Sequence, residues 1–327
     1  MISRQAYRIV CKVIIITNFS LLITHSASAQ TLTLVELNCE NLFDCHHDSL
    51  KQDTEWLPAS VRKWTPRRYR LKLKNIAQEI IACSGEDLPD LVALVEVEND
   101  SVLRDLTRRS PLRSEGYRYL MTESPDVRGI DVTLLYRPKT FQPICYDYLP
   151  VEPLPDMRPT RDILYVQGET MHHDTLHVFV VHAPSRFGGE KATRPNRRVV
   201  MERLTAAIRL LPADAKVVVA GDFNDYADSP SLQFLEAYGL RNISRDARGL
   251  HGAEGTYRYQ GHWESIDHVL VSPFLHGFVD QVYINDAPFL MEEDKQFGGL
   301  KPFRTYVGLH YQPGFSDHLP LVVRFRF

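Results

Sequence analysis

Polar side chains of catalytic type recur in this sequence at the ends of short apolar runs. In the clearest case, the run VVVAG at residues 217–221 leads into Asp222 and Asn224. Because residues i and i+2 of an extended chain point the same way, these two side chains share a face. A carboxylate and an amide so placed can hold a water molecule or a metal-bound phosphate, although an Asx turn would also use them.

Two earlier apolar runs also end in polar residues. Asn38 and Glu40 follow residues 32–37 on one face of the chain, and Glu96 follows residues 91–95. Burying an unpaired carboxylate is costly, so Glu96 needs a cation or hydrogen-bond donors. A metal ion would satisfy this side chain, and so would a salt bridge or a helix cap.

Histidines beside such runs add groups that can transfer protons. His182 ends one run. Asp267 precedes His268, and Asp317 precedes His318, each pair next to an apolar stretch. A carboxylate beside an imidazole can orient the ring and hold its charge, which suits acid–base chemistry. One pair could arise by chance, so the recurrence is the informative feature.

A basic segment follows His182 and indicates a patch that faces phosphate. Its five cations face a single acid, Glu190, within a chain of net charge −3. Cations at the start of a helix oppose the helix dipole. The alternative, a solvated helix start that binds nothing, is therefore less favoured than a phosphate-facing patch. The five cations of this segment are Arg186, Lys191, Arg194, Arg197 and Arg198. A second basic run, RRYR, occupies residues 67–70.

The elements that must position these residues are mostly strands. Short apolar, β-branched runs predict strands at residues 32–37, 88–97, 132–136, 163–166, 176–181, 216–220, 266–271 and 319–327. Apolar residues at helical spacing predict helices over 67–82 and 196–211, the second with Pro195 near its start. Long loops are expected at 46–65 and 285–315. This content predicts a layered α/β domain with packed sheets and helices outside.

The first 29 residues are typical of a cleaved secretory signal. They contain three basic residues and no acid, followed by an apolar run at 14–24 and by Ala27-Ser28-Ala29. We therefore expect a signal peptide at 1–29, one domain at 30–327 and a periplasmic or secreted protein. Loss of the three basic residues changes the net charge from −3 to −6. Such a chain does not hold polyanions by bulk charge alone.

Four cysteines remain beyond that segment: Cys39, Cys45, Cys83 and Cys145. An exported protein can form disulfides, and four cysteines allow three pairings. Their spacing matches no zinc pattern. A small buried apolar role is expected for Cys39 at least, and the disulfide state stays open.

Taken in order, these segments resemble the endonuclease/exonuclease/phosphatase superfamily, the deoxyribonuclease I-like fold. The most specific elements are the GDFN motif at 221–224 and the SDH motif at 316–318, with Glu96 upstream. The resemblance runs from Asn38 to the C-terminus. It implies a four-layer α/β/β/α sandwich of two mixed sheets, with the site where the strand ends converge.

The resemblance also implies a metal site. Glu96 would be the principal Mg²⁺ ligand, assisted by Asn38 and by Glu40, and Asp317 would support the metal or the water. Mn²⁺ or Ca²⁺ could replace Mg²⁺. Hard divalent cations prefer such oxygen ligands and neutralise phosphoryl oxygens.

The remaining site residues would act on the phosphate and the attacking water. Asp222 and Asn224 would position both, and His318, held by Asp267, would act as a base or a charged stabiliser. His182 matches a second histidine of the deoxyribonuclease I branch and would bind phosphate.

Two further assignments follow from the same resemblance. Arg161 lies where an arginine contacts the phosphate, and Asp131 could partner His182. The sequence carries no GxSxG motif, so we expect direct attack by water without a covalent intermediate.

Fold does not choose the substrate. An exported location favours a monomeric nuclease that cleaves DNA or RNA. The alternative is a phosphoesterase for a lipid headgroup or a small phosphodiester, similar to sphingomyelinases or inositol phosphatases. In that case the aromatic-rich stretch at 297–315 would contact the lipid or cover the site. A binding module that kept the fold and lost catalysis is disfavoured, because the polar set is intact.

Overall fold

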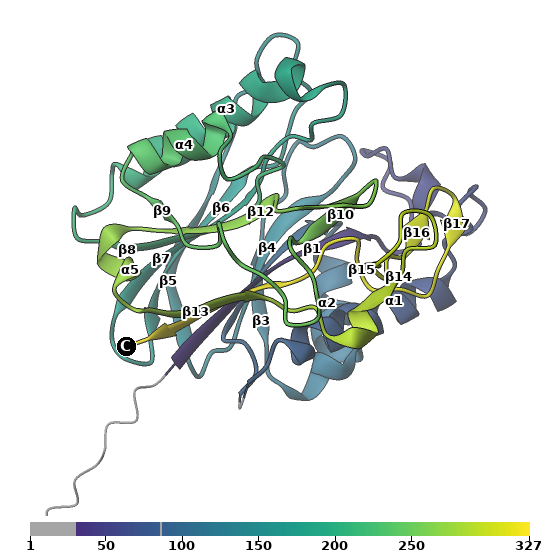
Figure 1. Cartoon of the computed structure of the whole chain (residues 1–327), viewed down its shortest axis with the longest axis horizontal. Helices are drawn as coiled ribbons and strands as arrows, with labels where there is room; N and C mark the ends of the chain where they lie inside the picture. Colours follow the sequence, from purple (N-terminus) through teal and green to yellow (C-terminus); the bar gives the residue numbers. More distant parts are fainter. Residues whose placement is uncertain (1–30, 86) are drawn as a thin grey trace, which may run out of the picture. The chain divides into compact units, whose positions relative to one another are not determined.

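The computed structural model describes residues 31–85 and 87–327. The signal peptide expected at 1–29 lies outside the described residues. The described chain forms two six-stranded mixed sheets that pack face to face, with helices on their outer faces (Figure 1). This arrangement confirms the α/β/β/α sandwich.

The first sheet contains the N-terminal and C-terminal strands. Strands β1 and β2 run parallel, and the other neighbouring pairs are antiparallel. The order across the sheet is β13 (Val279–Ile284), β18 (Leu321–Arg326), β1 (Thr31–Leu42), β2 (Leu91–Val97), β4 (Asp131–Tyr136) and β3 (Arg118–Met121).

The second sheet is built from the middle of the chain. Strands β7 and β8 run parallel within an otherwise antiparallel sheet. Its order is β5 (Phe141–Leu149), β6 (Ile163–Thr170), β7 (Thr175–His182), β8 (Lys216–Asp222), β12 (Asp267–Val271) and β9 (Arg241–Asn242).

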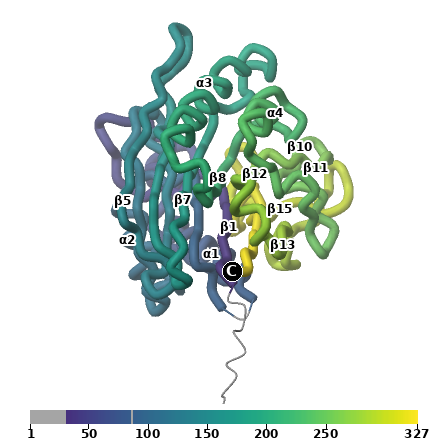
Figure 2. Tube along the Cα trace, turned by 90° about the vertical axis from the view of Figure 1, so that its left-hand side faces the viewer, coloured from purple at the N-terminus to yellow at the C-terminus, as the bar shows by residue number. Residues whose placement is uncertain are grey.

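Each sheet has its own pair of covering helices. Helices α1 (Pro66–Ala82) and α2 (Asp100–Arg109) pack on β1 and β2, and α3 (Glu190–Ile208) and α4 (Pro230–Ala237) pack on β7 and β8. Figures 1 and 2 show α3 and α4 side by side on one outer face. The shorter helical turns are η1 (Thr54–Trp56), η2 (Pro111–Ser114), α5 (Pro273–His276) and η3 (Pro288–Leu290).

Alternation along β1 shows how the sequence produces these layers. Leu32 and Leu34 join the apolar core between the two sheets, whereas Val35 and Leu37 join the core beneath α1. All four are essentially buried, and burying such a side chain contributes about 1.5–3 kcal/mol. A shift of one residue would exchange the two faces, so this pattern fixes the register.

The expected strands are confirmed, and two other expectations need correction. Helix α3 begins at Glu190 rather than near residue 196, so Pro195 lies inside the helix. The expected loop at 285–315 contains two short hairpins, β14–β15 and β16–β17. The small strands outside the two main sheets are β10 (Tyr257–Tyr259), β11 (His262–Glu264), β14 (Met291–Glu293), β15 (Leu300–Pro302), β16 (Tyr306–Val307) and β17 (His310–Tyr311).

The four cysteines of the described chain are free thiols, and Cys39 is buried as expected. Within residues 31–85 and 87–327, no helix is long and apolar enough to cross a membrane.

Candidate active site

Strand ends from both sheets meet at one end of the sandwich. In the second sheet, His182 and Asp267 are both register partners of Asp222, so three neighbouring strands carry one polar row. In the first sheet, Asn38 is paired with Val95, the residue before Glu96. The parallel pairs β1–β2 and β7–β8 therefore deliver their polar carboxyl ends to the same region.

Direct contacts join the two sheets there. The side-chain amide of Asn38 donates to Asp222 Oδ2 at 3.2 Å. His182 Nε2 lies 3.7 Å from Asp222 Oδ2 and 3.9 Å from Glu96 Oε1. Four residues from four strands, predicted separately from the sequence, thus form one cluster.

His318 is held in this cluster by a buried carboxylate. Its Nδ1 lies 2.8 Å from Asp267 Oδ2, and the Thr256 hydroxyl donates to the same oxygen. Burial disfavours the imidazolium, but the carboxylates of Asp267, Asp317 and Asp222 hold the pKa of His318 well above its usual value. The ring is therefore positively charged at neutral pH, and its Nε2 is the nitrogen left for a ligand.

Asp222 and Asn224 are fixed by the backbone around them. Asp222 Oδ1 accepts the Asn224 N–H at 2.8 Å, and the Asn224 amide donates to the Ala183 carbonyl at 3.1 Å. Burial and the nearby Asp267 carboxylate raise the pKa of Asp222 to about 7. Gly221 has φ +153°, and a Cβ there would lie 1.8 Å from the Val181 carbonyl oxygen. Only glycine fits this close approach of β7 to β8.

The ends of β1 and β2 share an unusual backbone. Glu40, Asn41 and Glu96 all have positive φ, at 48°, 56° and 61°. Such left-handed residues store strain and cluster at functional sites. Here they turn the Glu96 carboxylate toward the cluster, where its Oε2 accepts the Asn41 N–H at 2.9 Å.

Glu40 and Asp317 lie beside the cluster but are held by other groups. The two Glu40 oxygens accept the backbone N–H groups of Thr305 and Tyr306 at 2.6 and 3.0 Å. Arg304 donates to Asp317 at 2.7 Å and lies 3.5 Å from Glu40. The geometry gives Glu40 a bracing position, and Arg304 links the two acids.

Arg161 is buried next to the cluster. It donates to Asp126 Oδ2 at 3.1 Å and to the Ala183 carbonyl at 2.9 Å, the same carbonyl that Asn224 contacts. Burial, together with the Arg161 and Arg128 cations, holds the pKa of His182 well below its usual value. His182 is therefore a neutral imidazole.

Two expectations from the sequence are wrong: the pairing of Asp131 with His182, and a phosphate-facing basic patch at 186–198. Asp131 accepts hydrogen bonds from Thr122 and Ser124 and does not pair with His182 in the described structure. The proposed phosphate-facing patch at 186–198 is also largely neutralised. Arg197 is fully buried, with Nε 3.0 Å from Asp225. The other ion pairs are Arg186 with Glu264, Arg194 with Glu190, and Arg198 with Glu202.

Three residues of the site were missed by sequence reasoning. Arg128 lies 3.9 Å from Glu96 Oε1, and Arg304 holds Asp317. Glu36 is completely buried, and neither of its carboxyl oxygens has a hydrogen-bond partner among the described residues. Burial, and then the carboxylates of the site, raise the pKa of Glu36 well above its usual value. An acid inside the apolar run LTLVEL was the available signal for Glu36.

The carboxylates around the cluster fit a hard divalent cation. In the described chain, donor atoms of Asp222, Asp267 and His318 lie within 4.8 Å of one another, but Asp267 and the charged His318 are already paired, so we do not count these two side chains as ligands. Within the described chain, Asp267 Oδ1 and His182 Nδ1 are buried without a partner. Several carboxylates forced together in a buried site favour a bound cation, and oxygen ligands favour Mg²⁺ over softer metals.

Cavities flank the cluster on two sides. One, of about 280 Å³, reaches from Asp317 and Arg304 to the side chains of Tyr257, Tyr259 and Phe297. The other, of about 580 Å³, is lined by Arg128 and Arg161 and continues to other residues, among them Arg158, Ser185 and Phe187. A group bound between Asp317 and Arg161 would thus have room for a substituent on either side.

The sequence profile of the Endonuclease/Exonuclease/phosphatase family matches residues 33–326. The chain therefore belongs to this family, whose members are hydrolases acting on phosphoester bonds. No curated protein matches the sequence significantly.

Solved structures share the fold at low sequence identity. An endonuclease/exonuclease/phosphatase family protein from Bacteroides thetaiotaomicron is 17% identical, with 91% of this chain and 98% of that chain covered and a TM-score of 0.61. A mannosyl-6-phosphatase from the same species is 18% identical, with 90% and 100% covered and a TM-score of 0.60. A humanized D. rerio TDP2 is 15% identical, with 92% and 100% covered and a TM-score of 0.58. These identities establish the fold alone.

Proposed function

We propose that this protein is a Mg²⁺-dependent phosphodiesterase, and specifically an exported nuclease that cleaves DNA or RNA by direct attack of water. The observation that carries the proposal is the pair of cavities on either side of the polar cluster. A phosphodiester has two substituents on phosphorus, whereas a monoester needs room for one. The D. rerio TDP2 fold relative solved with a single-strand DNA product is compatible with a polymeric substrate.

Glu96 and Asn38 are the residues we assign to the metal, with Asp317 supporting it. When bound, Mg²⁺ would neutralise the phosphoryl oxygens and so lower the barrier to attack by water. Glu40, whose oxygens already accept two backbone N–H groups, would brace the end of β1, the strand that carries Asn38. Mn²⁺ or Ca²⁺ in place of Mg²⁺ remains part of the test.

Of the other side chains, one would accept a proton and the rest would donate hydrogen bonds to the phosphate. Asp222, with a pKa of about 7, would accept the proton of the attacking water. His318, kept charged by Asp267, would donate from Nε2 to the phosphoryl oxygen where charge grows. Neutral His182 and the Asn224 amide would donate to other oxygens. The structure thus favours the charged-stabiliser role for His318 over the base role.

Arg161 would act on the phosphate indirectly, through its hydrogen bonds and its positive charge. Its guanidinium orders the Ala183 carbonyl that also holds Asn224, and it is itself held by Asp126. Its positive charge would favour a bound phosphate even without a direct contact.

The second candidate is a phosphoesterase for a lipid headgroup or a small phosphodiester. It is favoured by the exposed aromatic rim of the smaller cavity, where Tyr259 and Phe297 are about half exposed. This rim comes from β10 and from the start of the stretch at 297–315 that the sequence singled out.

The test is hydrolysis by the purified chain with Mg²⁺, Mn²⁺ or Ca²⁺ and with EDTA. The panel contains plasmid DNA, RNA, bis-p-nitrophenyl phosphate, p-nitrophenyl phosphate and sphingomyelin. We expect EDTA-sensitive cleavage of nucleic acid and of the diester, with much slower cleavage of the monoester. Faster cleavage of the monoester would contradict the diesterase proposal, and sphingomyelin as the only natural substrate would select the second candidate.

Export has a separate test. Fractionation of the producing cell and N-terminal sequencing of the protein should place it outside the cytoplasm and begin it after Ala29. An intact N-terminus in the cytoplasmic fraction would contradict the signal peptide.

A further inference from the structure

A large groove lies on the outer helical layer, apart from the cavities beside the polar cluster. Its volume is about 1190 Å³, larger than either of them. Its walls are α1, α2 and η2, and the segment that follows β1 closes one side. We call it the α1–α2 groove.

Cations dominate the lining of the α1–α2 groove. It contains only two acids, Asp44 and Asp105. Asp44 is buried and accepts the His46 N–H, and Asp105 pairs with Arg109 at 3.0 Å. The cations, all with exposed side chains, are Arg70, Lys74, Arg104, Arg109 and Arg113.

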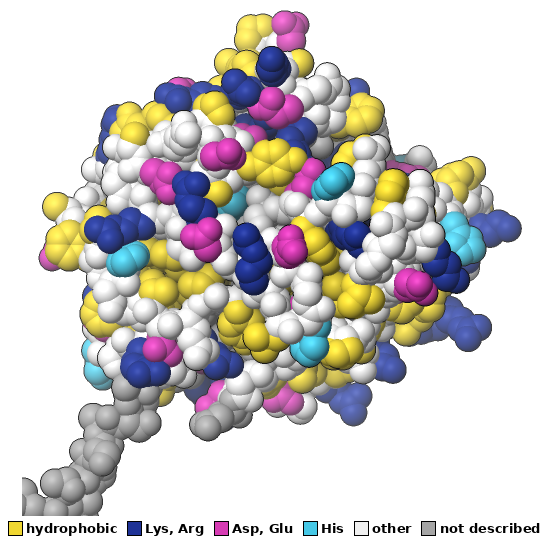
Figure 3. Space-filling model, in the orientation of Figure 1, with side chains coloured by type: hydrophobic (Ala, Val, Ile, Leu, Met, Phe, Trp, Pro, Cys, Tyr) yellow, Lys and Arg dark blue, Asp and Glu magenta, His cyan; other side chains and the backbone are white. Residues whose placement is uncertain are grey.

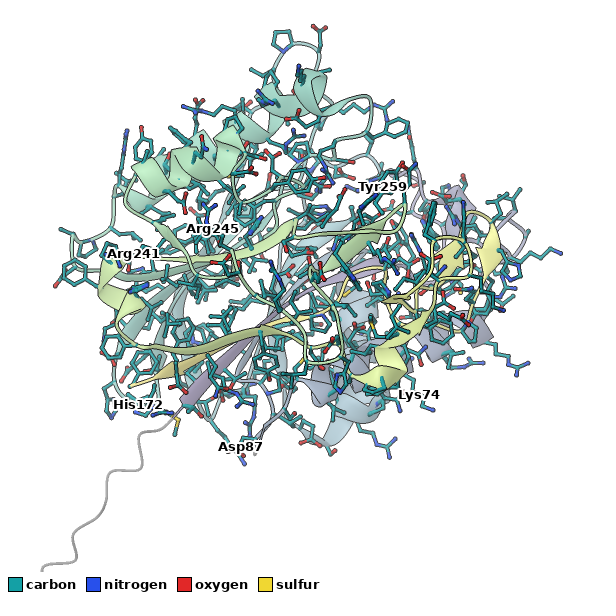
Figure 4. All side chains as sticks on the ribbon, viewed as in Figure 1. Lys74, Asp87, His172, Arg241, Arg245 and Tyr259 are labelled. Atoms are coloured by element: carbon teal, nitrogen blue, oxygen red, sulfur yellow. The ribbon has the colours of Figure 1, made fainter. Side chains whose placement is uncertain are left out.

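Three of these cations have no ion-pair partner in the part of the chain that the structure describes: Arg70, Lys74 and Arg113. Figure 3 shows Lys and Arg side chains gathered along the lower right edge, where Figure 1 places α1. Figure 4 shows Lys74 on the outer side of that helix. In a chain of net charge −3, this is a concentrated positive surface.

Helix stability does not explain the cations of α1. Arg70 and Lys74 are four residues apart, a spacing at which like charges repel and destabilise a helix by a few tenths of a kcal/mol. Two further arginines, at 67 and 68, lie in the first turn, where they oppose the helix dipole. In contrast, Arg108 and Arg109 end α2, where the dipole favours them. Arg68 has a structural role, because it donates to the Arg62 and Lys63 carbonyls and lies 4.0 Å from the centre of the Tyr311 ring. The exposed cations of α1 have no such role in the described chain, and they point to a ligand.

We propose that the α1–α2 groove is a second nucleic-acid binding site, which holds the phosphate backbone of a strand outside the site of hydrolysis. The groove is concave and several nucleotides in volume, which suits a flexible polymer better than a flat membrane. Among Phe, Tyr and Trp side chains, only Tyr69 lines the groove, and it is buried and bonds Asp105. The exposed His46 ring is therefore the only lining ring left for a base, so we expect binding to rest on the phosphate backbone and to depend little on sequence.

The groove lies close in the chain to the proposed metal ligands. Asp44, Cys45 and His46 on its wall directly follow β1, which carries Asn38 and Glu40. A strand held in the groove would raise the local concentration of its own phosphodiester bonds at the site. This consequence rests on the proposed function, whereas the binding itself does not.

The experiment measures binding without hydrolysis. Fluorescence anisotropy of a labelled 20-nucleotide DNA strand is followed in EDTA at several salt concentrations, with the full chain and with Arg70→Glu/Lys74→Glu/Arg113→Glu. We expect the triple variant to bind at least about tenfold more weakly. Its log–log salt dependence should become shallower by about 2, as expected for loss of about three phosphate contacts to a single strand. Hydrolysis of bis-p-nitrophenyl phosphate should stay within about twofold of the unchanged protein, because the groove does not form the site.

A matched control separates the groove from net charge. Lys139→Glu/Arg209→Glu/Arg241→Glu makes the same charge change at exposed positions outside the groove, and Figure 4 shows Arg241 on the opposite side from Lys74. Equal weakening by both triple variants, or by neither, would overturn the proposal. So would groove-dependent binding of phosphatidylglycerol vesicles with groove-independent binding of the strand.

Misfolding of the variant and failure of the proposed function can each be told apart from failure of the groove proposal. If circular dichroism shows that the Glu triple is unfolded, Arg70→Gln/Lys74→Gln/Arg113→Gln replaces it and should still weaken binding and flatten the salt dependence. If the full chain binds the strand through the groove but hydrolyses nothing with any metal, the proposed function fails and the groove stands.

Discussion

The polar cluster at the strand ends and the α1–α2 groove differ in how their charged groups are placed. In the cluster, His182, Asp222 and Asp267 are at most 4% exposed, and each contacts or faces a charged group from another strand. In the groove, the cations lie on the exposed side of helices and most act alone. Chemistry needs groups fixed in a low-dielectric environment, whereas capture of a polyanion needs only a field that reaches into solvent.

This contrast predicts different costs for the two regions. A buried charge that loses its partner is destabilised by several kcal/mol, whereas an exposed charge can be reversed at little cost to folding. Substitutions in the cluster should therefore change catalysis and pKa values, and those in the groove should change binding alone.

The largest effect is expected for Glu96→Gln. The amide keeps the shape of the side chain but removes the charge assigned to the metal, so the turnover rate with Mg²⁺ should fall by about 10³-fold. The rate is measured on bis-p-nitrophenyl phosphate, and strand binding in EDTA should not change. Glu123→Gln, at an exposed position, is the matched control. Retention of most of the activity by Glu96→Gln would refute the assigned ligand.

The next largest effect is expected for Asp267→Asn. The substitution removes the carboxylate that holds His318 Nδ1 and keeps its ring charged. We expect a loss of about 10²-fold in kcat/KM and a lower thermal stability, because the buried His318 charge loses its partner. A chemical-shift titration of the labelled histidine should show a lower pKa for His318. An unchanged pKa would mean that another group holds the proton.

Glu79→Gln should change the pH dependence of stability. Glu79 on α1 is fully buried, and burial raises its pKa from 4.5 to about 8. The folded state therefore holds a proton that the unfolded state releases, and the free energy of unfolding falls as pH rises from about 4.5 to about 8. Glutamine removes this slope, which is on the order of a few kcal/mol over that range.

Urea unfolding at pH 5 and at pH 8.5 measures this effect. The exposed Glu123→Gln variant should keep the slope of the unchanged protein. An equal slope in Glu79→Gln would show that other groups set the pH dependence.

The smallest effect is expected for Tyr259→Ala. Tyr259 lines the smaller cavity beside the cluster and is 54% exposed. Loss of one stacking surface should raise KM for a nitrophenyl diester by about three- to tenfold and leave kcat nearly unchanged. Strand binding through the α1–α2 groove should not change. An effect on kcat alone would place Tyr259 nearer to the reacting atoms.

The sequence predicts the frame of this molecule better than its ion pairs. Asp222, Asn224 and His318 were recognisable because motifs and strand parity are local features, and the strands that carry them formed as expected. The role of Arg197 was misjudged because its partner, Asp225, is reached only when α3 folds over β8. Arg304 could not be assigned for the same reason, since no local pattern brings it to Glu40.

The position of Glu40 teaches a related lesson. Strand parity predicted it on the face of Asn38, but a register shift and a positive φ interrupt β1 at this point, and its two backbone donors come from residues 305 and 306, far along the chain. Long-range contacts therefore decide which of several eligible carboxylates have free oxygens. Sequence patterns identify candidate residues, and the contacts made in the folded structure determine which of them have free atoms for a ligand.

The small hairpins between residues 285 and 315 stand outside both main sheets. The row from His182 through Asp222 to Asp267 depends on strand register, so an inserted residue in β7, β8 or β12 would turn one of these side chains away from the cluster. An insertion in the hairpins would shift no register in either sheet. This segment also supplies Phe297 to the cavity beside the cluster. Proteins that evolve from this chain could therefore acquire new substrates through insertions and deletions at 285–315, because the length of this segment does not affect the register of either main sheet.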